Sequence, residues 1–204
     1  ISETICSVGL IFIMFYGGFG TNLHEARPVL AKSVLLSTVG VVCTAGLVGI
    51  FVHQVLRLPL MESLLIGSVI ASTDAASVFN ILKAGRLSLK YGSASLLEVE
   101  SGSNDPMSYM LTALLSAMLA GQNVSVPRML LAQIVLGALC GLVIGRLTVF
   151  VLANLTFTDA HSRTILVFAA ALVAYALPDC LGGNGYLSVY LCGIIMGNAS
   201  ISQK

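Results

Sequence analysis

The sequence from residue 97 to residue 107 reads Leu97-Glu98-Val99-Glu100-Ser101-Gly102-Ser103-Asn104-Asp105-Pro106-Met107, and the apolar run 109–120 follows it directly. The chain has only 9 acidic residues, and three of them fall within this stretch. A carboxylate near the centre of a bilayer costs roughly 2.5–3.5 kcal/mol on insertion scales. Carboxylates placed beside an apolar run are therefore expected to have a function, and an ion or proton site is the first hypothesis.

The composition of the chain is typical of a membrane protein. Hydrophobic residues make up 57% of it and charged residues only 9%, whereas a soluble domain carries roughly 25% charged residues. The net charge of +1, without a basic stripe, argues against nucleic-acid binding. We therefore predict an all-α, polytopic membrane protein in a lipid bilayer.

The cysteines and the start of the chain give two further expectations. The 5 cysteines are scattered without Cys-x-x-Cys spacing, so we expect them to pack as small apolar side chains rather than to form disulfides or bind metal. The chain starts at Ile1, and no basic segment precedes its first apolar run, which is therefore not expected to be a signal peptide. We interpret residues 1–204 as a single transmembrane domain fragment of a larger protein.

Seven apolar runs predict about seven transmembrane helices, since about 20 residues span a bilayer. The third run contains a polar island, and the fourth contains the acidic stretch. Pro178 is expected to stop the sixth helix. The predicted helices cover residues 4–19, 28–56, 60–82, 89–120, 127–152, 162–177 and 186–197.

The basic residues predict the orientation of these helices. Seven spans leave Arg57 and Arg128 on one side of the membrane and the other eight of the 10 basic residues on the opposite side. The positive-inside rule assigns the basic side to the cytoplasm. The first helix then enters from outside, and Lys204 is cytoplasmic. The eight residues are Arg27, Lys32, Lys83, Arg86, Lys90, Arg146, Arg163 and Lys204.

The acidic stretch forms a polar stripe if it is helical. At about 100° per residue, Ser101, Asn104, Asp105 and Ser108 fall within roughly 100° of arc. Glu98 lies two turns before Asp105, nearly above it, and Glu100 lies about 140° around the helix from Asp105. Hard cations take oxygen ligands from carboxylates, hydroxyls and amides. The stripe supplies all three kinds of oxygen.

A second polar island, Ser72-Thr73-Asp74, lies in the middle of the third predicted helix. Such residues compete for backbone hydrogen bonds and are poor in helix interiors. Residues 71–76 are all small or polar, so we predict that the helix is interrupted near Thr73-Asp74, as in transporters whose broken helices bind ions at the bilayer midplane. We predict that Asp74 and Asp105 form a monovalent-cation and proton site.

Structural interpretations remain beside this one. Glu98 and Glu100 could be solvated at the cytoplasmic end of their helix, and Asp74 and Asp105 could make buried structural hydrogen bonds. Glycines at four-residue spacing predict close helix packing, or a dimer interface as the alternative. These glycines are Gly137, Gly141, Gly145, Gly193 and Gly197.

Four motifs stand in order along nearly the whole chain. They are Phe15-Tyr16-Gly17-Gly18-Phe19, Ser72-Thr73-Asp74-Ala75-Ala76, Glu100-Ser101-x-x-Asn104-Asp105, and Gly185-Tyr186-Leu187-Ser188-Val189-Tyr190-Leu191-Cys192-Gly193 followed by Met196-Gly197-Asn198. Together they resemble motifs of the monovalent cation:proton antiporter-1 family, in the expected order. The form of the acidic motif is most similar to the bacterial potassium/proton antiporter branch, whose inner-membrane members are tied to volume and potassium control.

The resemblance implies roles for the matching residues. Asp105 would be the ion- and proton-binding carboxylate, and Asp74, Thr73 and Ser101 would complete its site. Asn104 would hold the two helices in register, and an Asn at that position goes with electroneutral one-for-one exchange.

The resemblance also implies parts that lie outside this sequence. Glu100 would pair with an arginine of a later helix, and a second broken helix would follow. The chain would then cover the third to ninth of about thirteen helices and would not transport alone. The full-length protein would be a homodimer in the bacterial inner membrane.

The sequence thus favours a secondary active transporter rather than an enzyme, with no cofactor, in which a proton and a K⁺ or Na⁺ ion alternate at one site. A cation channel could use the same carboxylates. An intramembrane aspartyl protease also uses two Asp on neighbouring spans, but its Tyr-Asp and Gly-x-Gly-Asp settings are absent here.

Overall fold

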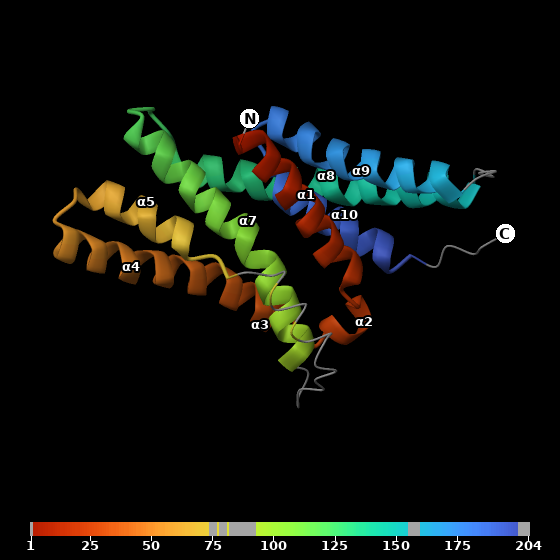
Figure 1. Ribbon diagram of the computed structural model, residues 1–204, viewed down its shortest axis with the longest axis horizontal. Coiled ribbons are helices and arrows are strands. Elements are labelled where there is room, and N and C mark those ends of the chain that lie inside the picture. Colours follow the sequence, from red (N-terminus) through yellow and green to blue (C-terminus); the bar gives the residue numbers. More distant parts are fainter. Residues whose placement is uncertain (1, 74–76, 78–80, 82–92, 155–159, 200–204) are drawn as a thin grey trace. The chain divides into compact units, whose positions relative to one another are not determined.

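The computed structural model describes residues 2–73, 77, 81, 93–154 and 160–199, and every regular element within them is a helix. The all-α prediction is confirmed. In chain order (Figure 1) the helices are α1 (Ser2–Gly20), α2 (Leu23–Ala26), α3 (Leu30–Leu35), a π-helical turn (Leu36–Gly40), α4 (Val41–Leu56), α5 (Leu60–Ile70), α7 (Ser93–Leu119), α8 (Val126–Asn154), α9 (Ala160–Cys180) and α10 (Gly185–Gly197).

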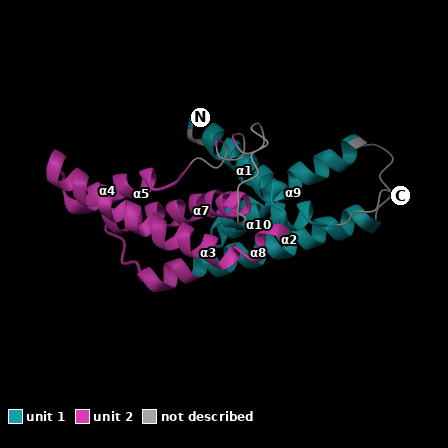
Figure 2. Ribbon diagram, turned by 90° about the horizontal axis from the view of Figure 1, so that it is seen from below, with its two compact units in different colours: residues 1–24, 132–204 teal, residues 25–131 magenta. Residues whose placement is uncertain are grey.

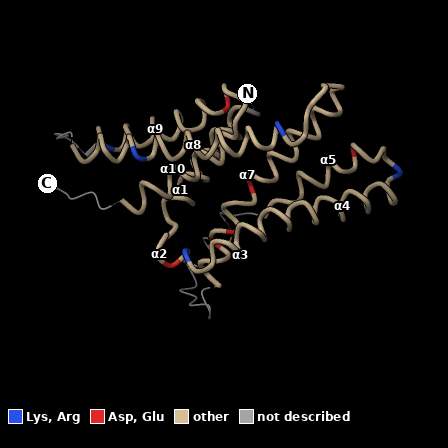
Figure 3. The backbone as a smooth tube through the Cα atoms, turned by 180° about the vertical axis from the view of Figure 1, so that it is seen from behind, with Lys and Arg blue, Asp and Glu red and all other residues tan. Residues whose placement is uncertain are grey.

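Length and hydropathy identify membrane-spanning candidates among these helices. Within the described residues, three segments are long and apolar enough to cross a bilayer: Leu30–Leu56, Val126–Asn154 and His161–Cys180. Thr4–Gly20, Leu60–Ile70 and Gly185–Gly197 are shorter apolar helices. Helix α7 has 27 residues, enough for roughly 40 Å, but carries the polar stripe. Charged positions are sparse along all these helices (Figure 3).

The chain divides into two compact units (Figure 2). Unit 1 consists of residues 1–24 and 132–204, and unit 2 consists of residues 25–131. Each unit has its own buried apolar core: that of unit 1 contains tyrosine and methionine side chains beside small and aliphatic ones, and that of unit 2 centres on Val41, Ala45 and Ala71.

Helix α10 is the centre of unit 1. Its buried side chains, which include Val189 and Cys192, are packed between α1, α8 and α9. A Cβ atom on Gly193 would lie 2.5 Å from the carbonyl oxygen of Phe15 in α1, so only glycine permits this approach. Across the unit, the rings of Phe12 and Phe168 join α1 to α9 edge to face, with centroids 5.1 Å apart.

The glycines of α8 form its contact with α10. A Cβ atom on Gly137 would lie 2.7 Å from the carbonyl oxygen of Asn184, and one on Gly141 would overlap that of Ser188. The two backbones therefore meet where the four-residue spacing predicted a packing face. The packing interpretation is confirmed within unit 1.

Polar side chains fix both ends of α10. Asn184 caps its first turn by accepting a hydrogen bond from the backbone N–H of Leu187 at 3.0 Å. At the other end, Asn198 Oδ1 accepts from the N–H of Leu23 at 2.9 Å, and Asn198 Nδ2 donates to the carbonyl of Thr21 at 2.8 Å. One amide therefore joins the end of α10 to the segment after α1.

The prediction that Pro178 stops the sixth helix is wrong, because α9 continues to Cys180. A proline removes one backbone donor but leaves its own carbonyl available. The carbonyl of Pro178 accepts hydrogen bonds from the N–H groups of Leu181, at 3.0 Å, and Gly183, at 2.7 Å. The helix ends where Gly182 adopts φ +79°, a conformation that glycine tolerates.

In unit 2, α4 and α5 form an antiparallel pair. Gly49 lies against Leu64, and Gly67 lies against the carbonyl oxygen of Ala45, so the numbering of one helix rises as that of the other falls. Helix α7 packs against α5 and α3 (Figure 1). The buried Ser33 of α3 donates to the carbonyl of Leu96 in α7 at 3.2 Å. These contacts position α5 and α7, which carry the polar residues.

Candidate functional site

Helix α5 ends in the middle of an apolar run. It has 11 residues, which at 1.5 Å per residue give roughly 16 Å, about half of the hydrocarbon core. It ends at Ile70, and residues 71–73 lie outside the helix, where the sequence predicted an interruption. Ala71 is buried, so this helix end faces protein. The break presents Ser72 and Thr73 to α7.

The side chain of Asp105 meets the first of these residues. Ser72 Oγ donates a hydrogen bond to Asp105 Oδ1, which joins the end of α5 to the middle of α7. Asp105 is half-buried. The donor is a neutral hydroxyl, so this hydrogen bond adds no positive charge, and a bound cation or a proton can supply one at the carboxylate.

Thr73 is shared by two buried residues of α7. Asn104 Nδ2 donates to Thr73 Oγ1, and Thr73 Oγ1 lies 3.1 Å from Ser101 Oγ. Since the threonine oxygen accepts from the amide, its own proton is available for Ser101. Ser101 and Asn104 are each only 1% exposed, so this network is closed to water on the α7 side.

Asn104 also links the network to a second carboxylate. Its Nδ2 lies 3.4 Å from Glu100 Oε1, one turn earlier on α7. The other atom of the same amide, Asn104 Oδ1, is buried and accepts no hydrogen bond from the described part of the chain. A buried acceptor without a donor is costly, so this oxygen is suited to a cation or a water molecule.

Most predicted site residues that the structure describes come together. Thr73, Ser101 and Asn104 form one hydrogen-bonded cluster, and Glu100 joins it through Asn104. Asp105 joins it through Ser72, whose hydroxyl bonds to Asp105 and lies 3.4 Å from the carbonyl oxygen of Thr73. Glu98 lies two turns before Asp105 on α7 and is half-buried. Asp74 lies outside the described residues, so its predicted place beside Asp105 stays a prediction.

Ser72 is a direct partner of Asp105, whereas the sequence indicated it only as an oxygen of the polar island and assigned the binding role on that segment to Thr73 and Asp74. The signal was its position in the Ser72-Thr73-Asp74 run, but an uninterrupted helix would turn Ser72 about 100° away from Thr73. Because the chain leaves the helix at Ala71, both hydroxyls reach α7.

The oxygen chemistry of the cluster suits a hard monovalent cation. It combines carboxylate, hydroxyl and amide oxygens, without sulfur or imidazole. Among the described residues, no group of three or more His, Cys, Asp or Glu is arranged to hold a metal ion.

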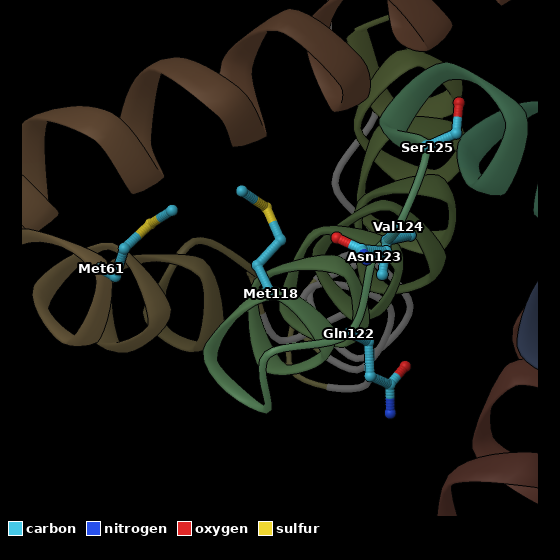
Figure 4. Close-up of a pocket in the computed structure, with 6 residues that line it drawn as sticks. All are labelled: Met61, Met118, Gln122, Asn123, Val124 and Ser125. Carbon is cyan, nitrogen blue, oxygen red and sulfur yellow. The ribbon is translucent and has the colours of Figure 1, made fainter.

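A cavity of about 420 Å³ lies at the other end of the α5–α7 pair (Figure 4). Met61 and Met118 line one part of it, and residues 122–125 of the α7–α8 loop, of which Val124 is apolar, line the rest. None of the described residues that line this cavity is a carboxylate, so the residues suited to bind a cation are those around Asp105.

Comparison with known proteins gives a family match over the whole chain. The model of a family described as "Sodium/hydrogen exchanger, transmembrane" matches residues 1–204. The chain is 39% identical to the K(+)/H(+) antiporter NhaP of Alkalimonas amylolytica over 202 residues, which are 98% of this chain and 35% of that protein. It is 38% identical to the K(+)/H(+) antiporter NhaP2 of Shewanella oneidensis, covering 95% of this chain and 34% of that protein.

A solved structure has the same fold. The sodium proton antiporter MjNhaP1 from Methanocaldococcus jannaschii at pH 8 superposes with a TM-score of 0.76 and 23% sequence identity, over 94% of this chain and 48% of that chain. The present chain therefore spans about a third of the length of the bacterial relatives and about half of this structure.

Proposed function

The chain belongs to the sodium/hydrogen exchanger family of transmembrane proteins, and from this premise we propose that it forms the ion-binding part of a cation/proton antiporter. The observation that carries the proposal is the meeting of Asp105 with Ser72 at the end of a helix that stops halfway through an apolar run. Thr73, Ser101 and Asn104 complete the cluster.

The proposed mechanism follows from charge compensation. A negative carboxylate away from water is costly unless a positive charge accompanies it. At Asp105 that charge is either a covalently bound proton or a cation held by the carboxylate and the neighbouring hydroxyls. Since one excludes the other, release of a proton accompanies binding of a cation. Exposure of the same site to each side of the membrane in turn then gives coupled exchange.

The remaining acidic residues have supporting roles in this proposal. Asn104 connects Glu100 to the Thr73 hydroxyl, so a charge on Glu100 is felt at the site through one amide. Asp74, which lies outside the described residues, is proposed as a second ion-binding carboxylate of the site. Glu98 is proposed to add to the negative potential of the cytoplasmic approach.

We propose K⁺ as the cation, with Na⁺ as the alternative. The relatives at 38–39% identity are named K(+)/H(+) antiporters. The Na(+)/H(+) antiporter 1 of Methanocaldococcus jannaschii is 26% identical over 201 residues. The full-length protein is proposed to be a homodimer in the bacterial inner membrane, with the Lys204 side in the cytoplasm.

The experiment that tests the antiporter is removal of the charge on Asp105. In the full-length protein, Asp105→Asn keeps the size of the side chain but cannot bind a proton and a cation in turn. We expect cation-driven proton movement to fall to the background of empty vesicles, measured by dye quenching in everted membrane vesicles with K⁺ and Na⁺ titrated separately.

Asp179→Asn is the matched control, because it makes the same chemical change at an exposed acidic residue near the end of α9, away from the site. It should retain exchange. Wild-type exchange in Asp105→Asn would rule out this site, and a conductive cation current without proton coupling in the wild type would indicate a channel.

A further inference from the structure

The polar contacts between α5 and α7 continue beyond the site. One turn after Asp105, the hydroxyl of Ser108 donates to the carbonyl oxygen of Ser68 in α5 at 2.5 Å. The Ser68 hydroxyl in turn lies 2.9 Å from Thr112 Oγ1, one turn further along α7. Together with Ser72–Asp105, these bonds follow the α5–α7 contact turn by turn.

The carbonyl of Ser68 needs an external donor because α5 is interrupted. A helix leaves its last four carbonyls without intrahelical donors. Ser68 is two residues before the last helical residue, Ile70, and the residue four positions after it, Ser72, lies outside the helix. In a membrane interior, each unsatisfied backbone group is strongly unfavourable. Ser108 supplies the donor that the broken helix lacks.

Water does not substitute for this donor. Ser68 is fully buried, and Ser108 is only 5% exposed. The apolar side chains Val41, Ala45 and Ala71 are buried in the same unit, with Met107 and Leu111 of α7 packed against them. The hydroxyl of Ser108 is therefore the group that satisfies the Ser68 carbonyl, and this bond helps to hold the end of α5 against α7.

We propose that Ser108 is a positioning residue for the cation site. Ser108 is one turn from Asp105 on α7, and Ser68 is one turn from Ser72 on α5, so the bond fixes the register in which Ser72 and Thr73 meet the stripe. This inference rests on the proposed antiporter function and concerns the same site. Without the Ser108–Ser68 bond, the end of α5 can shift, which misplaces the hydroxyls of Ser72 and Thr73. The Asp105 carboxylate is still present in the variant.

The test is Ser108→Ala in the full-length protein. We expect the K⁺ or Na⁺ concentration for half-maximal exchange to rise roughly five- to tenfold, as for the loss of one or two hydrogen bonds. The maximal rate per correctly folded protein should stay within about twofold. A purely structural role would lower the amount of folded protein and leave the half-saturating concentration unchanged.

Ser116→Ala is the matched control, because Ser116 is an exposed serine on the same helix, and it should behave as the wild type. Ser108→Thr keeps the hydroxyl and should restore the wild-type half-saturating concentration. If Ser108→Ala fails to assemble, Ser108→Cys provides a near-isosteric weak donor and should give an intermediate rise.

The two levels of the hypothesis fail differently. An unchanged half-saturating concentration in Ser108→Ala, with an active wild type, would overturn the positioning role alone. If Ser108→Cys is the variant that assembles, an unchanged half-saturating cation concentration in it would likewise overturn the positioning role. A full-length wild type without any cation-driven proton movement would overturn the proposed function itself.

Discussion

Thr73 is the residue on which the hydrogen bonds of the cluster converge. It accepts from Asn104 and is within 3.1 Å of Ser101, so one hydroxyl joins two buried side chains of α7 to the break after α5. A side chain of the same shape without the hydroxyl would leave the Asn104 amide without this acceptor. The side-chain volume at position 73 would be unchanged, and only the hydrogen bonds of the hydroxyl would be lost.

Thr73→Val should therefore weaken cation binding without removing exchange. Loss of hydrogen bonds worth about 1–1.5 kcal/mol corresponds to a rise of roughly five- to tenfold in the half-saturating cation concentration. Vesicle exchange assays over a range of K⁺ and Na⁺ concentrations would measure it. Thr148→Val is the control, since among the described residues the Thr148 hydroxyl bonds to the Ile144 carbonyl of its own helix, away from the site. Equal effects of both variants would argue against a role of Thr73 in the site.

At the residue scale, the sequence predicted the type of chemistry better than its detail. The roughly 100° arc of Ser101, Asn104 and Asp105 follows from helix geometry alone. The contacts of Ser72 and Ser68 do not, because they depend on the residue at which α5 ends, and no Gly or Pro marks that end. The donor for the Ser68 carbonyl comes from a different helix, which no local pattern indicates.

At the scale of elements, glycines determine how closely helices approach. On α8, a Cβ atom at Gly141 would overlap the backbone of Ser188, which is buried in α10. On α4, Gly46 has nothing within 4 Å of the position of a Cβ atom. The same substitution should therefore have opposite effects at the two positions.

Gly141→Ala should destabilise the protein by about 1–3 kcal/mol, because the added methyl group forces α8 and α10 apart. Gly46→Ala should be neutral or stabilising by up to about 1 kcal/mol, since alanine is the better helix former. The midpoint temperature of aggregation in detergent, followed by gel filtration after heating, would compare the two. A similar loss in both variants would contradict the packing of α8 on α10.

The position of helices was predictable from apolar runs, but their ends were less so. The run 28–56 predicted the segment Leu30–Leu56, and its π-helical turn at Leu36–Gly40 has no sequence signal that we recognised. Pro178 was expected to end a helix, yet the turn that ends α9 is set by Gly182. Pro178 removes only the one N–H that would donate to the carbonyl four residues earlier, and its own carbonyl accepts from the turn that follows, so the helix continues to Cys180.

At the scale of the whole molecule, the distribution of basic residues predicts the topology. Asn123, in the loop between α7 and α8, should be outside the cell, and His24, after α1, should be in the cytoplasm. Both side chains are exposed. In a full-length protein without its native cysteines, Asn123→Cys should react with a membrane-impermeant maleimide on intact cells. His24→Cys should react only after permeabilisation, and the reverse pattern would overturn the assigned orientation.

The amide of Asn198 has a consequence for how the protein is made. Its oxygen accepts a hydrogen bond from the N–H of Leu23, 175 positions earlier in the chain. At synthesis rates of about 5–20 residues per second, that partner is translated roughly 10–35 s after Leu23. During this interval α1 is in the bilayer without its contacts to α10. Its retention there during biogenesis therefore depends on its own hydrophobicity rather than on its final neighbours.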